Sequence, residues 1–291
     1  MIGVEEAVER SLHARADYSA TASEASKGAL RLPAGADIIS VVPKVSAVII
    51  AQNEEGRIEA ALRSVAFCDE VLVVDGGSSD ATRDLVTAMQ VRLIERPFDG
   101  FVAQKNFAIG QARHDVVLSL DADEEVSHLL RREIQEVCAG ETLPHSGYRI
   151  PRVTHYLGRE IRGTDWYPDW QLRLFDRRRG RFKGDLVHES VKVEGEVGRL
   201  AGEIIHRPYR DEADHLRRID RYTTLWAETA HRDGRRAWPG FGEAAAFFAF
   251  VRNYLFKGGI LLGSAGLTVS RMNALYVRQK FVKLKALEGR R

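Results

Sequence analysis

The chain has 291 residues, of which 44% are hydrophobic and 29% charged, and its formal net charge is +2 at pH 7. These values are ordinary for a soluble globular protein, and the length is sufficient for one large α/β domain with appendages. The two cysteines, Cys68 and Cys138, are too few and too far apart for a disulfide framework or a zinc site.

Residues 1–43 are rich in alanine, serine and charge, and they show no strong apolar period. We predict an N-terminal extension here, partly disordered or helical, with one helix over residues 3–16. Glu5, Glu6 and Glu9 interrupt any apolar stretch, so no secretory signal is expected and the chemistry is expected to be cytoplasmic.

Residues 44–208 are predicted to form the main domain, and its first half alternates short apolar runs with helical patterns. The apolar runs are typical of buried parallel strands and cover residues 45–50, 71–74, 91–94 and 116–120. Helical patterns follow the first three runs, at 58–65, 78–89 and 101–112. Ser78, Ser79 or Asp80 is expected to cap the second of these helices. The alternation implies βαβ crossovers, so the predicted fold class is α/β with a mostly parallel central sheet flanked by helices.

Beyond Asp123 the pattern becomes irregular. A helix is expected near residues 126–138, and short mixed segments follow at 148–153, 171–175, 182–187 and 203–206. Glycine and proline between these segments suit antiparallel strands and loops that complete the sheet. From about Asp211 the sequence is helical again, and we predict a C-terminal helical region over residues 209–291.

The segment 241–276 is apolar and aromatic, and the chain beyond Arg271 is strongly basic. Arg252 and Lys257 interrupt the apolar stretch, so it falls short of the ~20 residues that a transmembrane helix needs. A helix lying on an anionic membrane surface fits this pattern, and so does a helix packed on the protein's own core. We therefore predict that the C-terminal region associates with membranes, with the core helix as the alternative.

Carboxylates follow two of the predicted strands. Asp121 and Asp123 come after the run 116–120, and Asp75 comes after the run 71–74. In open α/β sheets, ligands bind beyond the carboxyl ends of the strands, where these side chains should lie. Carboxylate oxygens there suit a divalent cation such as Mg²⁺ or Mn²⁺, and such a cation suits a diphosphate. The pattern favours a nucleotide-diphosphate enzyme, with turn formation and helix capping as the alternative roles.

Other phosphate-binding patterns do not match this sequence. Gly76 and Gly77 follow Asp75 without a Gly-x-Gly-x-x-Gly fingerprint, and the sequence has no P-loop lysine. Glu124 and Glu125 stand where an aspartyl phosphatase would carry a pair of small residues. A nucleotidyltransferase remains a rival, although it would usually carry a Gly-rich basic loop after its first strand. A non-catalytic lipid-binding scaffold is the second rival.

Four motifs, in their order and spacing, resemble glycosyltransferase family 2 over residues 45 to about 195. They are the first strand ending in Asn53-Glu54-Glu55, the stretch from Val74 to Thr82, Gln104-Lys105-Asn106, and Leu120-Asp121-Ala122-Asp123-Glu124. Two further stretches, 167–175 and Val187-His188-Glu189, are similar to the subgroup that adds glucose to the inner core of bacterial lipopolysaccharide. The resemblance implies a GT-A fold, a nucleotide-sugar donor and inversion at the anomeric carbon.

The resemblance also implies roles for individual residues. Asn53, Glu54 and Glu55 would line the nucleotide pocket, and Asp75 would hydrogen-bond the base. Lys105 would neighbour the base or the diphosphate. Asp121 would approach the ribose or the metal, and Asp123 would be the principal metal ligand. The metal, Mg²⁺ or Mn²⁺, would stabilise the departing diphosphate.

Inverting transfer needs a carboxylate that takes the proton of the acceptor hydroxyl. Asp169 matches the position of this base in the family, with Asp165 as the fallback. Arg173 is predicted to pair with the diphosphate, because a guanidinium binds phosphate oxygens bidentately. His188 is a candidate third metal ligand or acceptor contact, with a structural role as the alternative. The basic residues of 177–183 are expected either to attract an acidic acceptor or to form a solvated hairpin.

These features predict a metal-dependent, inverting hexosyltransferase that lies on the inner face of the cytoplasmic membrane. The expected reaction moves a hexose to a lipid-linked glycan, with UDP-glucose as the first-choice donor and the lipopolysaccharide inner core as the first-choice acceptor. The alternative acceptors are polyprenol-linked, capsular or exopolysaccharide glycans, and the alternative activity is nucleotidyl transfer. The expected partners are the nucleotide-sugar donor, the glycan acceptor and the membrane surface; no nucleic acid is expected.

Overall fold

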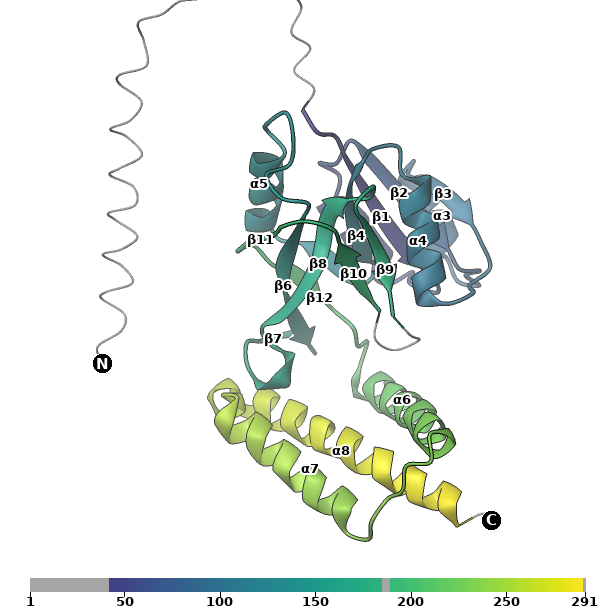
Figure 1. The fold of residues 1–291 in the computed structure, drawn as a ribbon, viewed down its shortest axis with the longest axis vertical. Helices are drawn as coiled ribbons and strands as arrows, with labels where there is room; N and C mark the ends of the chain where they lie inside the picture. The colour runs from purple at the N-terminus through teal and green to yellow at the C-terminus, as the bar shows by residue number, and fades with distance from the viewer. Residues whose placement is uncertain (1–41, 185–188, 290–291) are drawn as a thin grey trace, which may run out of the picture. The chain divides into compact units, whose positions relative to one another are not determined.

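The computed structural model describes residues 42–184 and 189–289. The helix predicted at 3–16 and the candidate ligand His188 lie outside the described residues. Figure 1 shows a central sheet flanked by helices, followed along the chain by a helical C-terminal region.

The first half of the sheet is parallel, as the alternating pattern predicted. Its strands lie in the order β3-β2-β1-β4, and helices connect them. These elements are β1 (Val45–Ala51), α2 (Ile58–Ser64), β2 (Glu70–Asp75), α3 (Thr82–Ala88), β3 (Arg92–Glu95), α4 (Phe101–Gln111) and β4 (Val116–Asp121). In the register, Asp75 lies beside Ala51 and Asp121 beside Ile50. The two predicted acidic strand ends therefore flank the end of the central strand.

Different helices cover the two faces of this half of the sheet. Along β1, Ala47 and Ile49 belong to the core formed with α2, α3 and α5 (His128–Val137), whereas Val48 belongs to the core formed with α4. This alternation follows from the period of two of a β-strand. Burial on both faces explains why these strands are continuous apolar runs in the sequence.

The second half of the sheet is mixed, and the strand order continues from β4 through β8, β6 and β12 to β5. β8 runs antiparallel to both β4 and β6, while β9 and β10 form a separate two-stranded sheet. The elements are β5 (Glu124–Val126), β6 (Gly147–Tyr156), β7 (Arg159–Ile161), the 3-10 turn η1 (Thr164–Trp166), β8 (Asp169–Asp176), β9 (Gly180–Lys183), β10 (Ser190–Val193), β11 (Val197–Arg199) and β12 (Ile204–His206).

Two helix starts differ in detail from the sequence pattern. The helix expected near 126–138 is α5, and a short strand, β5, precedes it because β12 pairs with that segment. The predicted cap of α3 was wrong: its N-cap is Ala81, which makes no side-chain cap bond. Asp80 instead accepts a hydrogen bond from the Thr82 N–H (3.0 Å), so it closes the turn just before the helix.

The C-terminal region is helical, as predicted. It consists of α6 (Glu212–Arg232), α7 (Phe241–Val251), the π-helical turn η2 (Arg252–Phe256), the 3-10 turn η3 (Gly259–Leu262) and α8 (Gly263–Glu288). α8 packs against both α6 and α7. Within the described ranges, no single helix is long and apolar enough to cross a membrane. Phe241–Phe256 and Gly259–Glu288 meet that criterion only as a pair bent by 68°.

Asn253 of η2 joins the C-terminal helices to the segment before β8. Its Oδ1 accepts a hydrogen bond from the backbone N–H of Asp165 (2.8 Å), and its Nδ2 donates to the Asp165 carboxylate (2.9 Å). Asn273 of α8 donates to the same Oδ1 (2.9 Å), and its own Oδ1 accepts from the Trp166 indole (3.1 Å). Because Asn253 is fully buried, these mutually satisfied polar groups fix η1 against η2 and α8.

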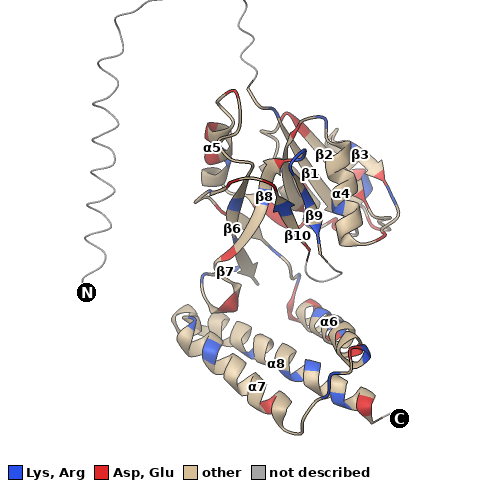
Figure 2. Cartoon of the chain, viewed as in Figure 1, with Lys and Arg blue, Asp and Glu red and all other residues tan. Residues whose placement is uncertain are grey.

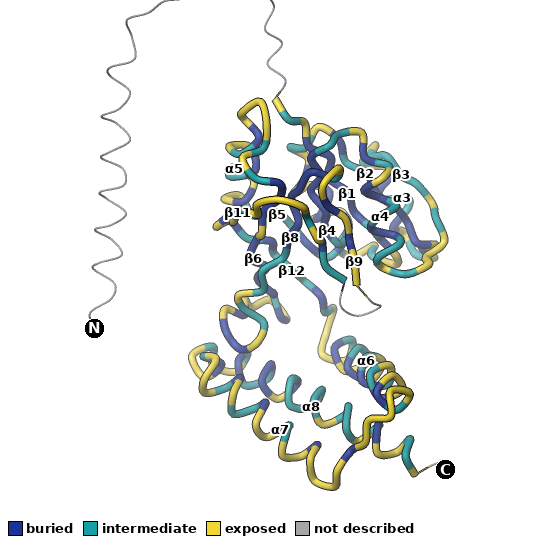
Figure 3. The backbone as a smooth tube through the Cα atoms, in the orientation of Figure 1, coloured by how far each residue is buried: buried dark blue, intermediate teal, exposed yellow. Residues whose placement is uncertain are grey.

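α7 packs against α8 with its small residues and exposes its large ones. Gly242, Ala246 and Ala249 are buried, whereas Phe247 and Phe248 are 71% and 62% exposed. Figure 3 shows how much of α7 is exposed. The alternative prediction for this segment, a helix packed on the protein's own core, therefore describes only its small-residue face.

His215 of α6 lies in an aromatic cluster that also contains a strand residue, Tyr156 of β6. The His215 ring stacks on Tyr209 with centroids 3.9 Å apart, and its Nδ1 lies 3.1 Å from the Tyr156 hydroxyl. Burial lowers the pKa of His215 from its ordinary value of 6.5 to about 4. The imidazole is therefore neutral in the folded protein at neutral pH.

We expect mild acid to destabilise the fold through this histidine. An unfolded histidine binds its proton near pH 6.5 and the folded His215 only near pH 4. The stabilisation is therefore complete above the unfolded value and decreases as the pH falls through this window. Thermal unfolding between these two pH values should show the decrease in stability, and His215→Phe should make this decrease smaller.

The exposed His128 supplies the control, since His128→Phe should leave the pH dependence as in the wild type. An identical pH dependence in the His215 variant would contradict the prediction.

Candidate active site

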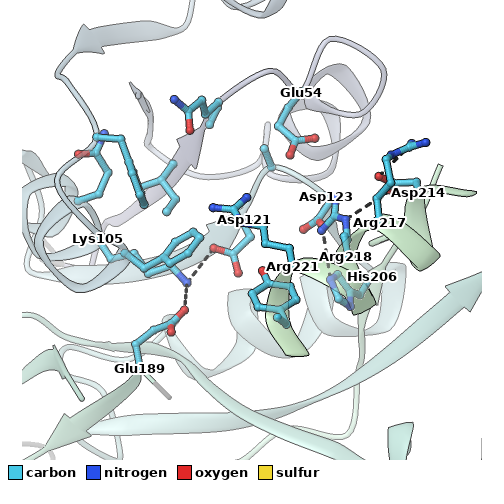
Figure 4. A pocket seen from close by; sticks show the side chains of 18 of the residues that line it. Glu54, Lys105, Asp121, Asp123, Glu189, His206, Asp214, Arg217, Arg218 and Arg221 are labelled. Carbon is cyan, nitrogen blue, oxygen red and sulfur yellow. Dashed lines mark hydrogen bonds and ion pairs between the residues drawn. The ribbon is translucent and has the colours of Figure 1, made fainter. Parts of the chain in front are cut away.

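A cavity of about 810 Å³, here called the main cavity, lies at the carboxyl ends of β1 and β4. Four residues predicted from the sequence line it: Glu54 of the loop after β1, Lys105 of α4, and Asp121 and Asp123 at and just beyond the end of β4. Figure 4 shows these side chains together with those that β12 and α6 contribute. The β12, α6 and α8 residues are His206, Asp214, Arg217, Arg218, Arg221, Tyr222 and Tyr276. The main cavity is therefore located where the strand order predicts a ligand site.

Asp123 faces a histidine that the sequence analysis missed. The Asp123 Oδ2 lies 3.6 Å from the Nε2 of His206, the last residue of β12. The antiparallel pairing of β12 with β5 places His206 opposite Glu124, directly beside Asp123. Burial raises the pKa of Asp123, but the hydrogen bond and charge of His206 outweigh it, so this pKa lies below its usual value. The one signal in the sequence was the position of His206 at the end of a predicted strand.

The donor atoms of this pair fit a divalent cation. Asp123 supplies carboxylate oxygen and His206 an imidazole nitrogen, and the His206 Nδ1 is buried without a hydrogen-bond partner among the residues that the structure describes. Within residues 42–184 and 189–289, no three His, Cys, Asp or Glu side chains converge as a complete metal site. Asp123 and His206 are therefore the residues that would hold the cation, and its remaining ligands would be oxygens of a bound diphosphate or water.

Asp121 is paired with two cations. Its Oδ1 lies 2.9 Å from the Nζ of Lys105, and its Oδ2 accepts a hydrogen bond from Arg173 (2.8 Å). Burial raises the pKa of Asp121, but the charges of Lys105 and Arg173 outweigh it and hold this pKa well below its usual range. Lys105 also reaches Glu189, with 3.4 Å between Nζ and Oε1. Asp121 is thus held ionised and fixed in position.

Glu124 extends this group toward the predicted base. Its Oε1 accepts hydrogen bonds from Arg173 and Arg152, each at 2.8 Å, and its side chain is fully buried. Arg152 in turn donates from Nε (2.9 Å) and from a terminal nitrogen (2.6 Å) to the Oδ2 of Asp169. The charged side chains therefore form one continuous series of alternating sign, here called the ion-pair chain: Asp169, Arg152, Glu124, Arg173, Asp121, Lys105 and Glu189.

The fallback base lies elsewhere. Asp165 forms an ion pair with Arg252 and accepts a hydrogen bond from Asn253 (2.9 Å), both in η2. It lines neither the main cavity nor the smaller cavity described below. Asp169 lines neither cavity either, but it belongs to the ion-pair chain, and its Oδ1 accepts a hydrogen bond from Gln171 (2.6 Å), which lines the smaller cavity. The structure thus connects Asp169, and not Asp165, to the cavity residues.

Asn53, Glu55 and Asp75 connect the loops that follow β1 and β2. Asn53, in the left-handed region at φ 58°, accepts a hydrogen bond at Oδ1 from the Ser79 N–H (2.8 Å). Glu55 accepts from the Ala81 N–H (3.1 Å). Asp75 is fully buried and accepts from the N–H groups of Gly77 and Ser78 (2.9 and 2.8 Å). None of the three is among the lining residues of the main cavity, where Gln52 and Glu54 of the first loop are found.

A second cavity of about 430 Å³, here called the side cavity, adjoins the main one. Lys105, Asp121 and Glu189 line both cavities and form their common wall. The remaining lining residues come from β6, β8, β9 and β10: Arg149, Arg152, Trp170, Gln171, Leu172, Arg173, Phe182, Ser190, Val191 and Lys192.

The basic residues at 177–183 line neither cavity. Arg177 and Arg178 form ion pairs with Asp115 at 3.3 and 3.1 Å, and Arg178 also pairs with Asp176 at 2.7 Å. Arg179 donates to the Ser146 hydroxyl (3.1 Å). Of the two interpretations of this segment, the arrangement fits the solvated hairpin.

The sheet, its acidic edge and the cavity beyond it define a GT-A glycosyltransferase. The sequence profile of glycosyl transferase family 2 matches residues 46–191, which hold Lys105, Asp121, Asp123, Glu124, Asp169 and Arg173. The chain belongs to glycosyl transferase family 2. The fold predicted from the sequence is thereby confirmed.

Known relatives carry related names. The lipopolysaccharide core biosynthesis glycosyltransferase LpsC of Rhizobium meliloti is 30% identical over 248 residues, which cover 81% of this chain and 90% of LpsC. An uncharacterised glycosyltransferase of Rickettsia bellii is 41% identical over 160 residues, which cover 53% of this chain and 54% of that protein. The first match extends well beyond the residues of the family profile, so it includes part of the C-terminal helical region.

Solved structures match smaller parts of the fold. S. aureus TarS, residues 1–349, is 25% identical, with a TM-score of 0.33, over 40% of this chain and 38% of its own. Glucosyl-3-phosphoglycerate synthase of Mycobacterium tuberculosis, crystallised with Mn²⁺, UDP and phosphoglyceric acid, is 23% identical. That match has a TM-score of 0.32 and covers 40% of this chain and 44% of the synthase. Each superposition spans less than half of this chain.

Proposed function

We propose that this protein is a metal-dependent, inverting glycosyltransferase that moves a hexose from a UDP-sugar to the lipopolysaccharide inner core. Glucose is the first-choice hexose. The observation that carries the proposal is the Asp123–His206 pair, which lies in the main cavity beside the ionised Asp121. The match to LpsC over 90% of its length supports an acceptor of the lipopolysaccharide core type. We propose UDP as the nucleotide and glucose as the sugar because residues 167–175 resemble the subgroup that adds glucose to the lipopolysaccharide inner core.

The donor would occupy the main cavity. Asn53, Glu55 and Asp75 would shape the nucleotide end through the loops that they hold together. Asp123 and His206 would hold a divalent cation, whose Lewis acidity offsets the charge that develops on the departing diphosphate. Because an imidazole nitrogen stands beside the carboxylate, Mn²⁺ suits the pair better than Mg²⁺, which prefers oxygen ligands. Lys105 and Arg173, which hold Asp121 in place, remain the candidate cations for the diphosphate.

Asp169 would take the proton of the acceptor hydroxyl. A carboxylate offers about four acceptor positions. Arg152 occupies two on Oδ2 and Gln171 one on Oδ1, so one position on Oδ1 remains for the hydroxyl. The same three hydrogen bonds fix the direction of the carboxylate, which favours a productive approach of the acceptor. Arg152 and Gln171 therefore act as positioning residues for the base.

A donor screen tests this function. We expect UDP-glucose with Mn²⁺ to raise the unfolding temperature by several degrees, since a ligand at 100 times its Kd adds about 2.7 kcal/mol of stability. EDTA should remove most of the effect, and GDP-mannose should produce little. Addition of lipopolysaccharide core that lacks glucose should then release UDP, measured by a coupled assay. Absence of stabilisation by any nucleotide sugar would overturn the proposal.

We also propose that α7, η2 and η3 lie on the inner face of the cytoplasmic membrane. Trp238, Phe256 and Leu261 are 79%, 78% and 87% exposed; together with Phe247 and Phe248 they are here called the apolar surface, and so many exposed large apolar side chains are unusual for a water-facing region. Figure 2 shows few charges on α7 and basic residues along α8. Apolar side chains bordered by lysine and arginine suit the interface of an anionic bilayer.

Vesicle binding tests the membrane contact. The double variant Phe256→Ser, Leu261→Ser should bind phosphatidylglycerol-containing vesicles at least about tenfold more weakly in co-sedimentation, because two large apolar side chains no longer enter the interface. Leu129→Ser is the matched control, since Leu129 is 54% exposed on α5, outside the apolar surface. Unchanged vesicle binding would contradict the proposal. A dimer that dissociates in the double variant would assign the surface to a second copy of the chain.

A further inference from the structure

We propose that the side cavity binds an anionic group, phosphate or carboxylate, on the acceptor sugar. This inference rests on the proposed function, and it names a chemical property of the acceptor that the function alone leaves open. The side cavity shares the lining residues Lys105, Asp121 and Glu189 with the main cavity, so its occupant would lie next to the donor site.

The cations of the side cavity divide into two groups. Lys105, Arg152 and Arg173 are members of the ion-pair chain, and their charges are matched by carboxylates within it. Arg149 and Lys192 line the same cavity, and neither forms an ion pair with any carboxylate in the described part of the chain. These two cations are therefore available for a negatively charged ligand.

A third cation is placed against this group by the strand register. Arg199 of β11 is the register partner of Arg149 on the neighbouring strand β6, so the two side chains emerge side by side on one face. The Arg199 guanidinium also lies 5.1 Å from the ring centre of Trp170, which lines the side cavity. Like charges on adjacent strands repel each other, and a bound anion would relieve this repulsion. A guanidinium pair is well suited to the oxygens of phosphate or carboxylate.

The position of the side cavity suits an acceptor. Arg152 and Gln171, the two side chains that hold Asp169, both line it. A sugar anchored there by its anionic group would thus lie next to the groups that hold the proposed base. The Nε of Arg173, another lining residue, is buried and has no hydrogen-bond partner among the described residues. Arg149 and Lys192 line the side cavity only, and the Asp123–His206 pair lines the main cavity only.

Binding of simple sugars to the UDP-saturated protein tests the inference. With UDP and Mn²⁺ filling the main cavity, calorimetric titrations compare glucose 6-phosphate, glucuronate and glucose. At least one of the two anionic sugars should bind about tenfold or more tightly than glucose, as expected for charge-assisted hydrogen bonds. Tighter binding of glucose 6-phosphate would identify phosphate as the recognised group, and tighter binding of glucuronate would identify carboxylate.

Charge-matched variants locate the effect. The double variant Arg149→Gln, Lys192→Gln should bind the anionic sugar no better than glucose, with its affinity for UDP unchanged. The control Lys44→Gln, Arg132→Gln removes the same charge from exposed positions that line neither cavity and should keep the preference. If the wild type shows no preference, or if the Arg149 and Lys192 variant retains it, the inference is wrong. Failure of the wild type to bind UDP would instead overturn the proposed function, and the inference with it.

Discussion

Asp123→Asn should lower glycosyl transfer at least about a thousandfold, because it removes the carboxylate charge that would hold the cation opposite the leaving diphosphate. The effect should exceed that of His206→Ala, since the imidazole carries no negative charge to the cation. Transfer is measured as UDP release with saturating donor and acceptor. Mn²⁺-dependent stabilisation by UDP in thermal unfolding gives a second readout, and it should be lost in the same variant.

Asp84→Asn provides the matched control for this substitution. Asp84 is an exposed residue of α3 and lines neither cavity, so its replacement should leave both transfer and Mn²⁺-dependent UDP binding unchanged. The circular dichroism spectrum of Asp123→Asn should match that of the wild type, because the side chain lies at the edge of the core. Transfer within a few-fold of the wild type in the Asp123 variant would rule out the proposed metal site.

Glu124→Gln should destabilise the fold by about 1.5–3 kcal/mol, because Arg152 and Arg173 each lose one of their two carboxylate partners and keep only Asp169 and Asp121, respectively. Arg173 is 4% exposed and Glu124 is fully buried, so solvent cannot replace the lost carboxylate charge. The expected decrease in unfolding temperature is on the order of 5 °C for a protein of this size. Thermal unfolding followed by circular dichroism at neutral pH measures it.

The neighbouring residue supplies the comparison. Glu125 also pairs with an arginine, Arg207 at 2.8 Å, but both side chains are partly exposed. Glu125→Gln should therefore cost only about 0–1 kcal/mol, as for most exposed ion pairs. Equal effects at the two positions would mean that the ion-pair chain contributes no more to stability than an ordinary surface pair does.

The first half of the fold could be predicted because its signals are local. A strand buried on both faces, such as β1, is a continuous apolar run, and the helices between the strands carry their own period. Asp121 and Asp123 follow such a run directly, so their position at the edge of the sheet followed from the strand itself. Lys105 was identified only through the family resemblance, because its contact with Asp121 joins α4 to β4.

The residues that the sequence analysis missed depend on pairing between distant strands. His206 reaches Asp123 only because β12 joins the sheet between β6 and β5, and nothing in its own segment specifies that neighbour. Glu124 was counted as evidence against a phosphatase and as the end of a family motif, without a role of its own, yet it links Arg152 to Arg173. Both omissions have the same physical cause, since long-range register is set by the assembled sheet and leaves little trace in a local window.

The hydrogen bonds of Asn253 and Asn273 with Asp165 and Trp166 couple the exposed face of α7 to the sheet as a rigid joint. If α7 rests on lipid as proposed, this joint sets the height of the reaction centre above the bilayer. An enzyme held at one height selects its acceptor by distance. It glycosylates the acceptor unit at that distance from the lipid anchor and does not modify identical units that lie nearer or farther out.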